Sequence, residues 1–296
     1  MSDHAANPFS LSGQTAFVTG AARGIGRAVC VAFARAGVTS IAGLDIAGRA
    51  SDIQHYELPT RDELAETGRL AEQHGAKFLP LICDQRDGAA LSAAVAQAHA
   101  AFGKLDIVAA IAGIQAFKPL LDMQDADWDD QIDINLTGTA KLLRAAAKLM
   151  VRDGGGRIIL TSSTQGQHGM RDGAAYSASK WGLFGLMKSA ALEFAEHHIT
   201  VNAVVPGLID TPLTRNHDRY AQAFKEGQGK TPGGMPDAEL EQTVVDAQTK
   251  KIPLGIPFLP PEDIAGAYVY LASPAARLVT GTSISVTGGD SAHNIA

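Results

Sequence analysis

The sequence has no excess of basic residues and no long apolar segment. Lysine and arginine together number 25 against 31 aspartates and glutamates, which gives a formal charge of −6 and an isoelectric point near 5.8. This balance argues against a nucleic-acid-binding surface. No apolar run reaches the roughly 18 residues of a membrane-spanning helix, and the first residues, MSDHAANPFS, contain no apolar signal core. We therefore expect a soluble, cytoplasmic protein with no nucleic-acid or membrane partner.

Cysteine is scarce as well. The two cysteines, Cys30 and Cys83, stand in the apolar runs AVCVAF and LPLICD. Such positions favour small buried hydrophobic side chains over a disulfide or a pair of metal ligands. No cluster of histidine, cysteine and carboxylate residues has the spacing of metal ligands, so we expect no metal site.

What the chain does contain is a regular alternation of short apolar runs and longer Ala-rich segments. Strands that are apolar on both faces and separated by helices indicate a parallel sheet covered on both sides. The predicted strands are Thr15–Thr19, Val38–Leu44, Phe78–Ile82, Ile107–Ala110, Arg157–Leu160, Thr200–Val205 and Ser283–Val286, and the helical segments include Gly26–Ala36, Ala89–Phe102 and Ile132–Met150. We predict an α/β fold: one domain over residues 1–296 with a doubly wound, seven-stranded parallel sheet.

Two segments interrupt the alternation. Residues 46–60 are polar and irregular, and they delay a helix that begins near Arg61. Residues 208–256 are rich in Gly, Pro and charge, with only a weak helical pattern around Ala238–Lys250. Long irregular stretches in compact domains are usually functional covers or disordered. We expect an insertion at 46–60 and a substrate lid at 208–256.

The first predicted strand runs into the glycine-rich stretch TGAARGIG at 19–26. Gly20, Gly24 and Gly26 would let the backbone turn tightly and let a pyrophosphate approach the N-terminus of the following helix. The next strand ends at Asp45, 25 residues past Gly20. A carboxylate there accepts hydrogen bonds from ribose hydroxyls and repels a 2′-phosphate, which favours NAD over NADP.

Three charged residues leave alternatives open. Arg23 and Arg49 lie near Asp45 in the sequence and could soften the preference for NAD. Asp84 closes the third strand and could bind an adenine amine, or it could instead cap the helix that follows.

Four motifs together resemble those of the short-chain dehydrogenase/reductase family. They are TGAARGIG at 19–26, the serines at 162–163, YSASK at 176–180 and VNAVVPGLIDTPL at 201–213. The resemblance covers the chain from about Leu11 to Gly289. It implies a single Rossmann-type domain, NAD(P)-dependent oxidation or reduction of an alcohol/carbonyl pair, and a homotetramer.

By position, the resemblance also implies roles for single residues. Tyr176 would be the catalytic acid/base, Lys180 its partner, Ser163 the hydroxyl that orients substrate, and Asn135 the family's helix-kinking asparagine. The implied cofactor-binding residues are Gly20, Ala22, Arg23, Gly24, Ile25, Gly26, Asp45, Asp84, Gln85, Ala112, Gly113, Tyr176, Lys180, Pro206, Gly207, Ile209 and Thr211. The candidates for substrate contact are Gln165, His168, Met170 and Leu208, of which His168 and Met170 could equally be ordinary loop packing.

Two details refine the resemblance. The family carries Asn-Asn-Ala-Gly or Asn-Ala-Gly after the fourth strand, whereas this chain has Ala-Ile-Ala-Gly at 110–113, so we expect fewer side-chain hydrogen bonds there and weaker tethering of the cofactor. The stretch after Asp45 resembles an insertion of the carveol-dehydrogenase-like, mycofactocin-associated branch. In that branch the insertion is thought to cover the bound NAD and slow its exchange.

The spacing of Tyr176 and Lys180 fits acid/base chemistry. Residues four apart share one face of a helix, so the phenol and the ammonium would be neighbours. A free phenol has a pKa of about 10, too high for a base near neutrality. The ammonium and the positive charge of oxidised nicotinamide would lower that pKa toward working pH. Asn135 could hold a water that relays protons through Lys180, or could simply be a buried amide in a kinked helix.

We therefore expect an NAD-dependent enzyme that interconverts a secondary alcohol and a ketone, with hydrophobic surroundings for the substrate. One alternative is a 3-oxoacyl-thioester reductase, which would prefer NADP; Asp45 and the acidic isoelectric point count against it. A second alternative is a non-catalytic NAD-binding sensor. Such a sensor has no need of Ser163, Tyr176 and Lys180 together.

Overall fold

The computed structural model describes residues 7–293, which are built around a seven-stranded sheet in the order β3-β2-β1-β4-β5-β6-β7. Every neighbouring pair of strands is parallel. The strands are β1 Thr15–Thr19, β2 Ser40–Asp45, β3 Lys77–Ile82, β4 Ile107–Ala110, β5 Gly156–Thr161, β6 Ile199–Pro206 and β7 Ser283–Val286. This is the predicted doubly wound, Rossmann-type α/β fold.

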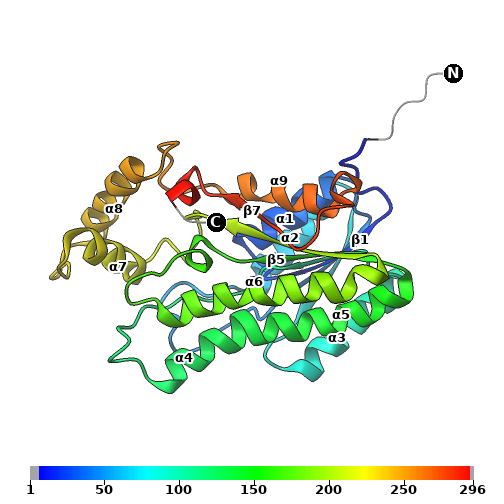
Figure 1. Cartoon of the computed structure of the whole chain (residues 1–296), viewed down its shortest axis with the longest axis horizontal. Helices are drawn as coiled ribbons and strands as arrows, with labels where there is room; N and C mark the ends of the chain where they lie inside the picture. Colours follow the sequence, from blue (N-terminus) through cyan, green and yellow to red (C-terminus); the bar gives the residue numbers. More distant parts are fainter. Residues whose placement is uncertain (1–6, 294–296) are drawn as a thin grey trace.

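Helices cover both faces of the sheet (Figure 1). Side chains of α1, α2 and α9 pack on one face, and side chains of α3, α5 and α6 pack on the other. The α-helices are α1 Gly24–Arg35, α2 Arg61–Glu72, α3 Gly88–Phe102, α4 Asp125–Ile132, α5 Thr139–Asp153, α6 Ala174–Phe194, α7 His217–Gln228, α8 Asp237–Lys251 and α9 Pro261–Ala272. Because all strands are parallel, their carboxyl ends meet at one edge of the sheet, where ligands bind in folds of this kind.

The pattern of apolar residues predicted the positions of the strands correctly. All seven predicted strands are present, and their ends differ from the prediction by no more than two residues. Each residue of β1 and of β6 is buried, as expected of strands covered on both faces. Helix α2 begins at Arg61 because Thr60 and Glu63 form a capping box, in which each side chain accepts the other's backbone N–H.

The segment predicted as helical over Ile132–Met150 is helical, but it is not one regular α-helix. Helix α4 ends at Ile132, a π-helical turn follows over Asp133–Gly138, and α5 begins at Thr139. In this wider turn the Asn135 amide reaches the backbone of Ile114, accepting its N–H at 2.8 Å and donating to its carbonyl at 2.9 Å. Hydrogen bonding to a distant segment therefore accompanies the break in helical pattern, which no local propensity reveals.

The lid segment, residues 208–256, is more regular than the sequence suggested. It contains α8, close to the predicted weak helix, and also α7, which the sequence analysis missed. Asn216 caps α7 by accepting the N–H of Arg219, and Gly229 ends it in a left-handed conformation with φ of 70°. The two helices enclose a small apolar cluster of Tyr220, Phe224, Leu240, Val244 and Phe258. The insertion at 46–60, by contrast, contains neither helix nor strand, as predicted.

Two threonines stabilise the chain after β4, where the family's asparagines are missing. The Thr19 hydroxyl oxygen accepts the N–H groups of Ile111 and Ala112 at 3.0 and 3.1 Å, and the Thr161 hydroxyl donates to the carbonyl of Ala110 at 2.7 Å. Neighbouring strands therefore supply side-chain hydrogen bonds to this segment, and the weaker tethering of the cofactor stays a prediction.

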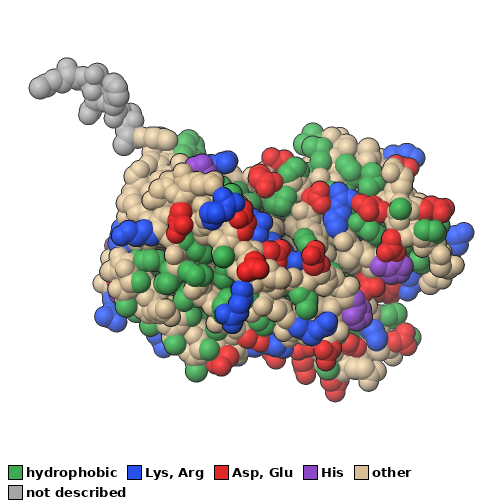
Figure 2. Space-filling view, turned by 180° about the vertical axis from the view of Figure 1, so that it is seen from behind, with side chains coloured by type: hydrophobic (Ala, Val, Ile, Leu, Met, Phe, Trp, Pro, Cys, Tyr) green, Lys and Arg blue, Asp and Glu red, His purple; other side chains and the backbone are tan. Residues whose placement is uncertain are grey.

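Other composition-based expectations concern the cysteines and the surface. Cys30 and Cys83 are both buried free thiols, as predicted. Among residues 7–293, no helix is long and apolar enough to cross a membrane. On the face shown in Figure 2, lysine and arginine side chains are interspersed with aspartate and glutamate side chains among the described residues.

Candidate active site

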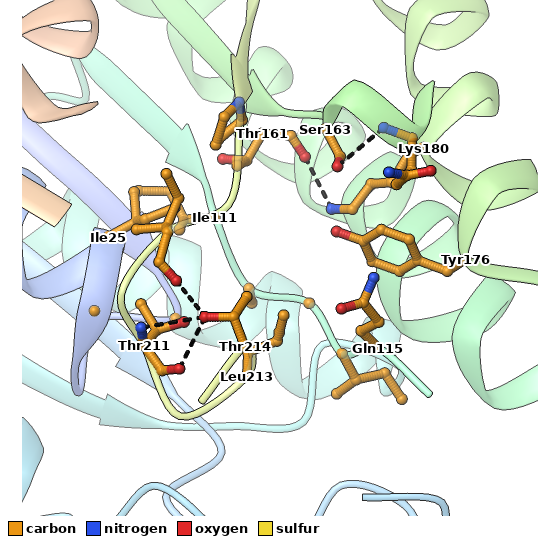
Figure 3. A pocket seen from close by; sticks show the side chains of 18 of the residues that line it. Ile25, Ile111, Gln115, Thr161, Ser163, Tyr176, Lys180, Thr211, Leu213 and Thr214 are labelled. Carbon is orange, nitrogen blue, oxygen red and sulfur yellow. Dashed lines mark hydrogen bonds between the residues drawn. The ribbon is translucent and has the colours of Figure 1, made fainter. Parts of the chain in front are cut away.

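A single pocket at the carboxyl edge of the sheet gathers nearly all residues that the sequence pointed to. Of the predicted catalytic, cofactor-binding and substrate residues, only Ala22 and Asn135 do not line it. Figure 3 shows Ser163, Tyr176 and Lys180 on one side of this pocket, facing Ile25 and Thr211 on the other. The pocket is thus shared by the glycine-rich loop, the loops after β4, β5 and β6, the insertion and the lid segment.

The glycine-rich loop is shaped by contacts that leave no room for side chains. A Cβ at Gly26 would lie 1.9 Å from the carbonyl oxygen of Gly20, and a Cβ at Gly20 would lie 2.9 Å from the Cα of Ala112. Gly20 and Gly24 have φ values of 67° and 54°. Helix α1 starts at Gly24, and no side chain caps it. Its first N–H groups are therefore available to a phosphate, and the cradle fits a dinucleotide.

Asp45 is buried at the end of β2, and its two carboxylate oxygens accept backbone N–H groups. One binds Ala22 at 3.0 Å and the other binds Ala47 at 3.1 Å. Ala22 therefore faces Asp45 rather than the pocket. Arg23 donates to the carbonyl of Glu57, and Arg49 donates to the carbonyl of Gln54 at 3.4 Å.

Both arginines contact the insertion rather than Asp45. Arg23 reaches from the glycine-rich loop to the Glu57 carbonyl, and Arg49, itself in the insertion, binds the Gln54 carbonyl within it. The buried Asp45 carboxylate lies at the pocket wall and pairs with neither arginine. Arg23 lines the same pocket, and its Nη1 lies 3.8 Å from Glu63 without a hydrogen-bond partner among the described residues.

Asp84 does not cap α3, so that interpretation is wrong. The cap is Asp87, which accepts the N–H groups of Ala89 and Ala90. Asp84 instead pairs with Arg86 at 2.7 Å, and Arg86 also pairs with Asp130 at 3.0 Å. Burial raises the pKa of the Asp84 carboxyl, but the hydrogen bonds from Arg86 outweigh it and hold the pKa below its usual range.

Tyr176 and Lys180 lie one turn apart on α6, both almost completely buried. The Lys180 ammonium donates to the carbonyl of Thr161 at 2.9 Å and lies 5.6 Å from the centre of the Tyr176 ring. Ser163 follows β5, and its hydroxyl hydrogen-bonds the Tyr176 phenol. The same Ser163 oxygen accepts the N–H of Gln165 at 3.2 Å, which fixes its position. Serine, phenol and ammonium thus converge on one wall of the pocket.

Burial dominates the electrostatics of this wall in the protein alone. Burial raises the pKa of Tyr176 to about 12; the hydrogen bond from Ser163 and the charge of Arg219 lower it in part. Burial also lowers the pKa of Lys180 to about 8. A lowering of the phenol pKa toward neutrality by the ammonium and oxidised nicotinamide together stays a prediction.

Asn135 lies behind the catalytic wall. Its amide is buried and fully engaged, with the backbone of Ile114 and, at 3.1 Å, with the hydroxyl of Ser179. A Cβ on Gly113 would lie 3.0 Å from the Asn135 side-chain oxygen and 3.5 Å from the Lys180 nitrogen. The structure thus shows Asn135 as a buried amide. Asn135 does not line the pocket itself but lies next to Gly113, which does.

Several lining residues were not among those predicted from the sequence, and Tyr56 and Arg219 are two of them. Tyr56 lies in the insertion, and its charge acts on the Tyr176 phenol. The Tyr56 hydroxyl accepts from Gln54 at 3.2 Å and from the N–H of Gln115. Arg219 enters from α7, a helix that the sequence pattern did not reveal. Only the aromatic character of Tyr56 in a polar stretch could have signalled a ligand-facing role.

Comparisons with known proteins agree with this geometry. The sequence profile of the family described as short chain dehydrogenase matches residues 14–221. The (-)-trans-carveol dehydrogenase of Rhodococcus erythropolis is 38% identical over 284 residues, covering 94% of this chain and 98% of that protein.

Two solved structures resemble the fold over nearly their whole length. Carveol dehydrogenase from Mycobacterium avium, in complex with NAD, has a TM-score of 0.86 and 33% identity, with 95% of this chain and 98% of that chain covered. A gluconate 5-dehydrogenase from Burkholderia cenocepacia, in complex with NADP and tartrate, has a TM-score of 0.79 and 27% identity, with 98% and 99% covered. On the strength of these matches, the chain belongs to the short-chain dehydrogenase/reductase family of NAD(P)-dependent oxidoreductases.

Proposed function

We propose that the protein interconverts a secondary alcohol and a ketone by hydride transfer, with NAD as its cofactor. The observation that carries this proposal is the meeting of Ser163, Tyr176 and Lys180 on one wall of the pocket that the glycine-rich loop also lines. These three side chains are sufficient for the proton transfer that accompanies hydride transfer. The family resemblance to carveol dehydrogenases supports the same reaction class.

Each of these three residues would have its own role in the reaction. Bound NAD would supply the hydride acceptor. Tyr176, as phenolate, takes the proton of the substrate hydroxyl, and Ser163 holds the substrate oxygen by a hydrogen bond. Lys180 binds ribose hydroxyls of the cofactor and stabilises the phenolate by its charge. The burial of all three side chains excludes water, which strengthens these interactions.

NAD rather than NADP is proposed because the carboxylate of Asp45 stands at the pocket wall and pairs with no arginine. A carboxylate in this position accepts hydrogen bonds from ribose hydroxyls and repels a 2′-phosphate. Relatives that hold NAD and relatives that hold NADP both exist, so the cofactor preference depends on this chain's own residues.

The insertion is proposed to cover the cofactor and slow its exchange. Ala50, Gln54, Tyr56 and Pro59 line the same pocket as the glycine-rich loop. Hydrogen bonds hold the segment in place: Ser51 hydrogen-bonds Asp130, and the side-chain oxygen Oε1 of Gln54 accepts the N–H groups of Ala50 and Ser51 at 2.8 and 3.1 Å. Release of a dinucleotide would therefore require these contacts to break as well as those of the phosphates.

We also propose a cytoplasmic homotetramer, as the family resemblance implies. Trp181 and Leu192 of α6 are 52% and 82% exposed in the single chain. Large apolar side chains in such positions are covered when subunits associate.

Replacing Tyr176 by phenylalanine tests the reaction. We expect turnover of the best substrate from a panel of secondary alcohols to fall at least about a hundredfold, because no other group can take the proton. NAD affinity, measured by calorimetry, should change little, since the phenol is not the main anchor of the cofactor. Tyr270→Phe, which removes a hydroxyl from α9 outside the pocket, is the matched control. Retention of most activity by Tyr176→Phe would rule out this assignment.

Exchanging the charge at the end of β2 tests the cofactor preference. Asp45→Asn together with Ile46→Arg should raise the NADP-to-NAD ratio of kcat/KM at least about tenfold, a change of about 1.4 kcal/mol. The amide keeps one oxygen for the N–H of Ala22, so the loop should survive. Ile46→Arg alone is the control. A wild-type protein that uses NADP as well as NAD would show that the interpretation of Asp45 is mistaken.

Shortening the insertion tests its role as a cover. Replacement of residues 47–59 by a short Gly-Ser turn should speed NAD dissociation at least about tenfold in stopped-flow trapping experiments, because the contacts of Ser51, Gln54 and Tyr56 are lost. Asp52→Ser, a change at an exposed position of the same segment, should leave the rate unchanged. Equally fast release from all three proteins would identify a surface loop that touches no cofactor.

A further inference from the structure

One charged side chain in the pocket has no part in the reaction as described so far. Arg219 stands in the first turn of α7, in the lid segment, and lines the pocket together with Tyr176. Its charge lowers the pKa of the Tyr176 phenol, so the guanidinium is close enough to act on the reacting centre. A cation in this position contradicts the expectation of wholly hydrophobic surroundings for the substrate.

The guanidinium is held in place by uncharged partners. One of its nitrogens, Nη1, donates to the side-chain oxygen of Gln222. Gln222 is buried and is itself anchored, because its nitrogen donates to the carbonyl of Arg171 at 3.1 Å and to Glu226 at 2.9 Å. The ring of Phe117 lies 5.9 Å from the guanidinium carbon, within the range of a cation–π contact. These contacts fix the orientation of the group without neutralising it.

Arg215, one turn earlier, shows what a paired arginine looks like in the same segment. It makes two hydrogen bonds to Asp210, at 2.8 and 3.1 Å, and a third to Glu241 at 2.6 Å. These partners raise its pKa. Arg219, by contrast, has no carboxylate oxygen within 4.0 Å among residues 7–293, and its Nε and Nη2 donate to no described residue. Burial lowers its pKa.

The charges facing Arg219 are few and partly compensated. Glu226 and Asp290 line the pocket and act on the guanidinium at longer range. Asp290 is paired with Lys251 at 3.2 Å, and Glu226 is exposed and hydrogen-bonded to Gln222. Asp290 is thus balanced by Lys251, and neither carboxylate lies within ion-pair distance of the guanidinium, which leaves its remaining N–H groups available to a ligand.

From this geometry, and resting on the proposed oxidoreductase function, we infer that the substrate carries a carboxylate that binds Arg219. The guanidinium is planar and offers parallel N–H donors that match the two oxygens of a carboxylate. The reaction would oxidise a hydroxy acid to an oxo acid. The carbinol hydrogen leaves with its electron pair as hydride to NAD, the hydroxyl proton goes to the Tyr176 phenolate, and the carboxylate stays unchanged on Arg219.

The test compares hydroxy acids with their methyl esters and primary amides, which keep the alcohol but lack the charge. For each pair, kcat/KM is measured with NAD for wild type, Arg219→Gln and Arg219→Lys. We expect wild type to prefer the acids, and Arg219→Gln to lose about ten- to a hundredfold on the acids while changing little on the neutral analogues. Arg219→Lys should recover part of the loss, because it restores the charge without the planar fork.

Lys230→Gln is the control for loss of one positive charge from the lid segment, since Lys230 is exposed and does not line the pocket. Thermal unfolding of each variant checks that the lid remains folded. Equal preference of wild type for acids and neutral analogues, or equal losses on both in Arg219→Gln, would overturn the inference and leave Arg219 as a structural cation of the lid.

A second measurement separates this inference from the proposed function. Binding of the same acids and neutral analogues to the NAD complex of Tyr176→Phe is followed by calorimetry, which needs no turnover. Acid-selective binding that disappears in Tyr176→Phe combined with Arg219→Gln supports the inference even if the reaction class is wrong. Absence of acid-selective binding overturns the inference, whereas a protein that reduces NAD with none of the alcohols overturns the proposed function.

Discussion

The structure of the site depends on a buried ammonium that lacks a counter-ion. Lys180 is 4% exposed, and its hydrogen-bond partner is the neutral carbonyl of Thr161, with no carboxylate oxygen within 4.0 Å among residues 7–293. Removing an unpaired charge from water is unfavourable, and the lowered pKa of Lys180 expresses this strain. Two elements position the ammonium: α6 carries the residue, and β5 presents the carbonyl that accepts its hydrogen bond. The ammonium lines the pocket beside the Tyr176 phenol.

The sequence was sufficient to predict the sheet and the residues that lie at its carboxyl edge. Strands apolar on both faces, glycines at 20, 24 and 26, and the spacing of Tyr176 and Lys180 are local patterns, and each has a direct structural meaning. The capping of α3 by Asp87 and the existence of α7 could not be foreseen in the same way, and the kink at Asn135 followed from the family resemblance rather than from the local pattern. Each is decided by hydrogen bonds or packing between groups that compete for similar roles, such as two aspartates before one helix.

The least patterned segments meet over the pocket. His55 of the insertion pairs with Asp218 of the lid segment at 2.9 Å, and Gln222 of the lid reaches the carbonyl of Arg171 in the loop after β5. Such contacts join residues separated by 163 and 51 positions, so no window of sequence contains them. The same segments contribute Tyr56 and Arg219 to the pocket. The residues proposed to cover the cofactor and to bind substrate therefore lie where the sequence is least informative, while those that show the family lie where it is most informative.

Burial holds the Tyr176 phenol protonated in the protein alone, and positive charge brought in with oxidised NAD is what would make it a base. The most direct test is a tyrosinate absorbance titration of wild type minus Tyr176→Phe, with and without NAD. Without NAD, the Tyr176 phenol should titrate with a pKa of about 12. With NAD bound, the phenolate is stabilised, so that pKa should fall by about two units or more. A pKa unchanged by NAD, or already near neutrality without it, would contradict this picture of the site.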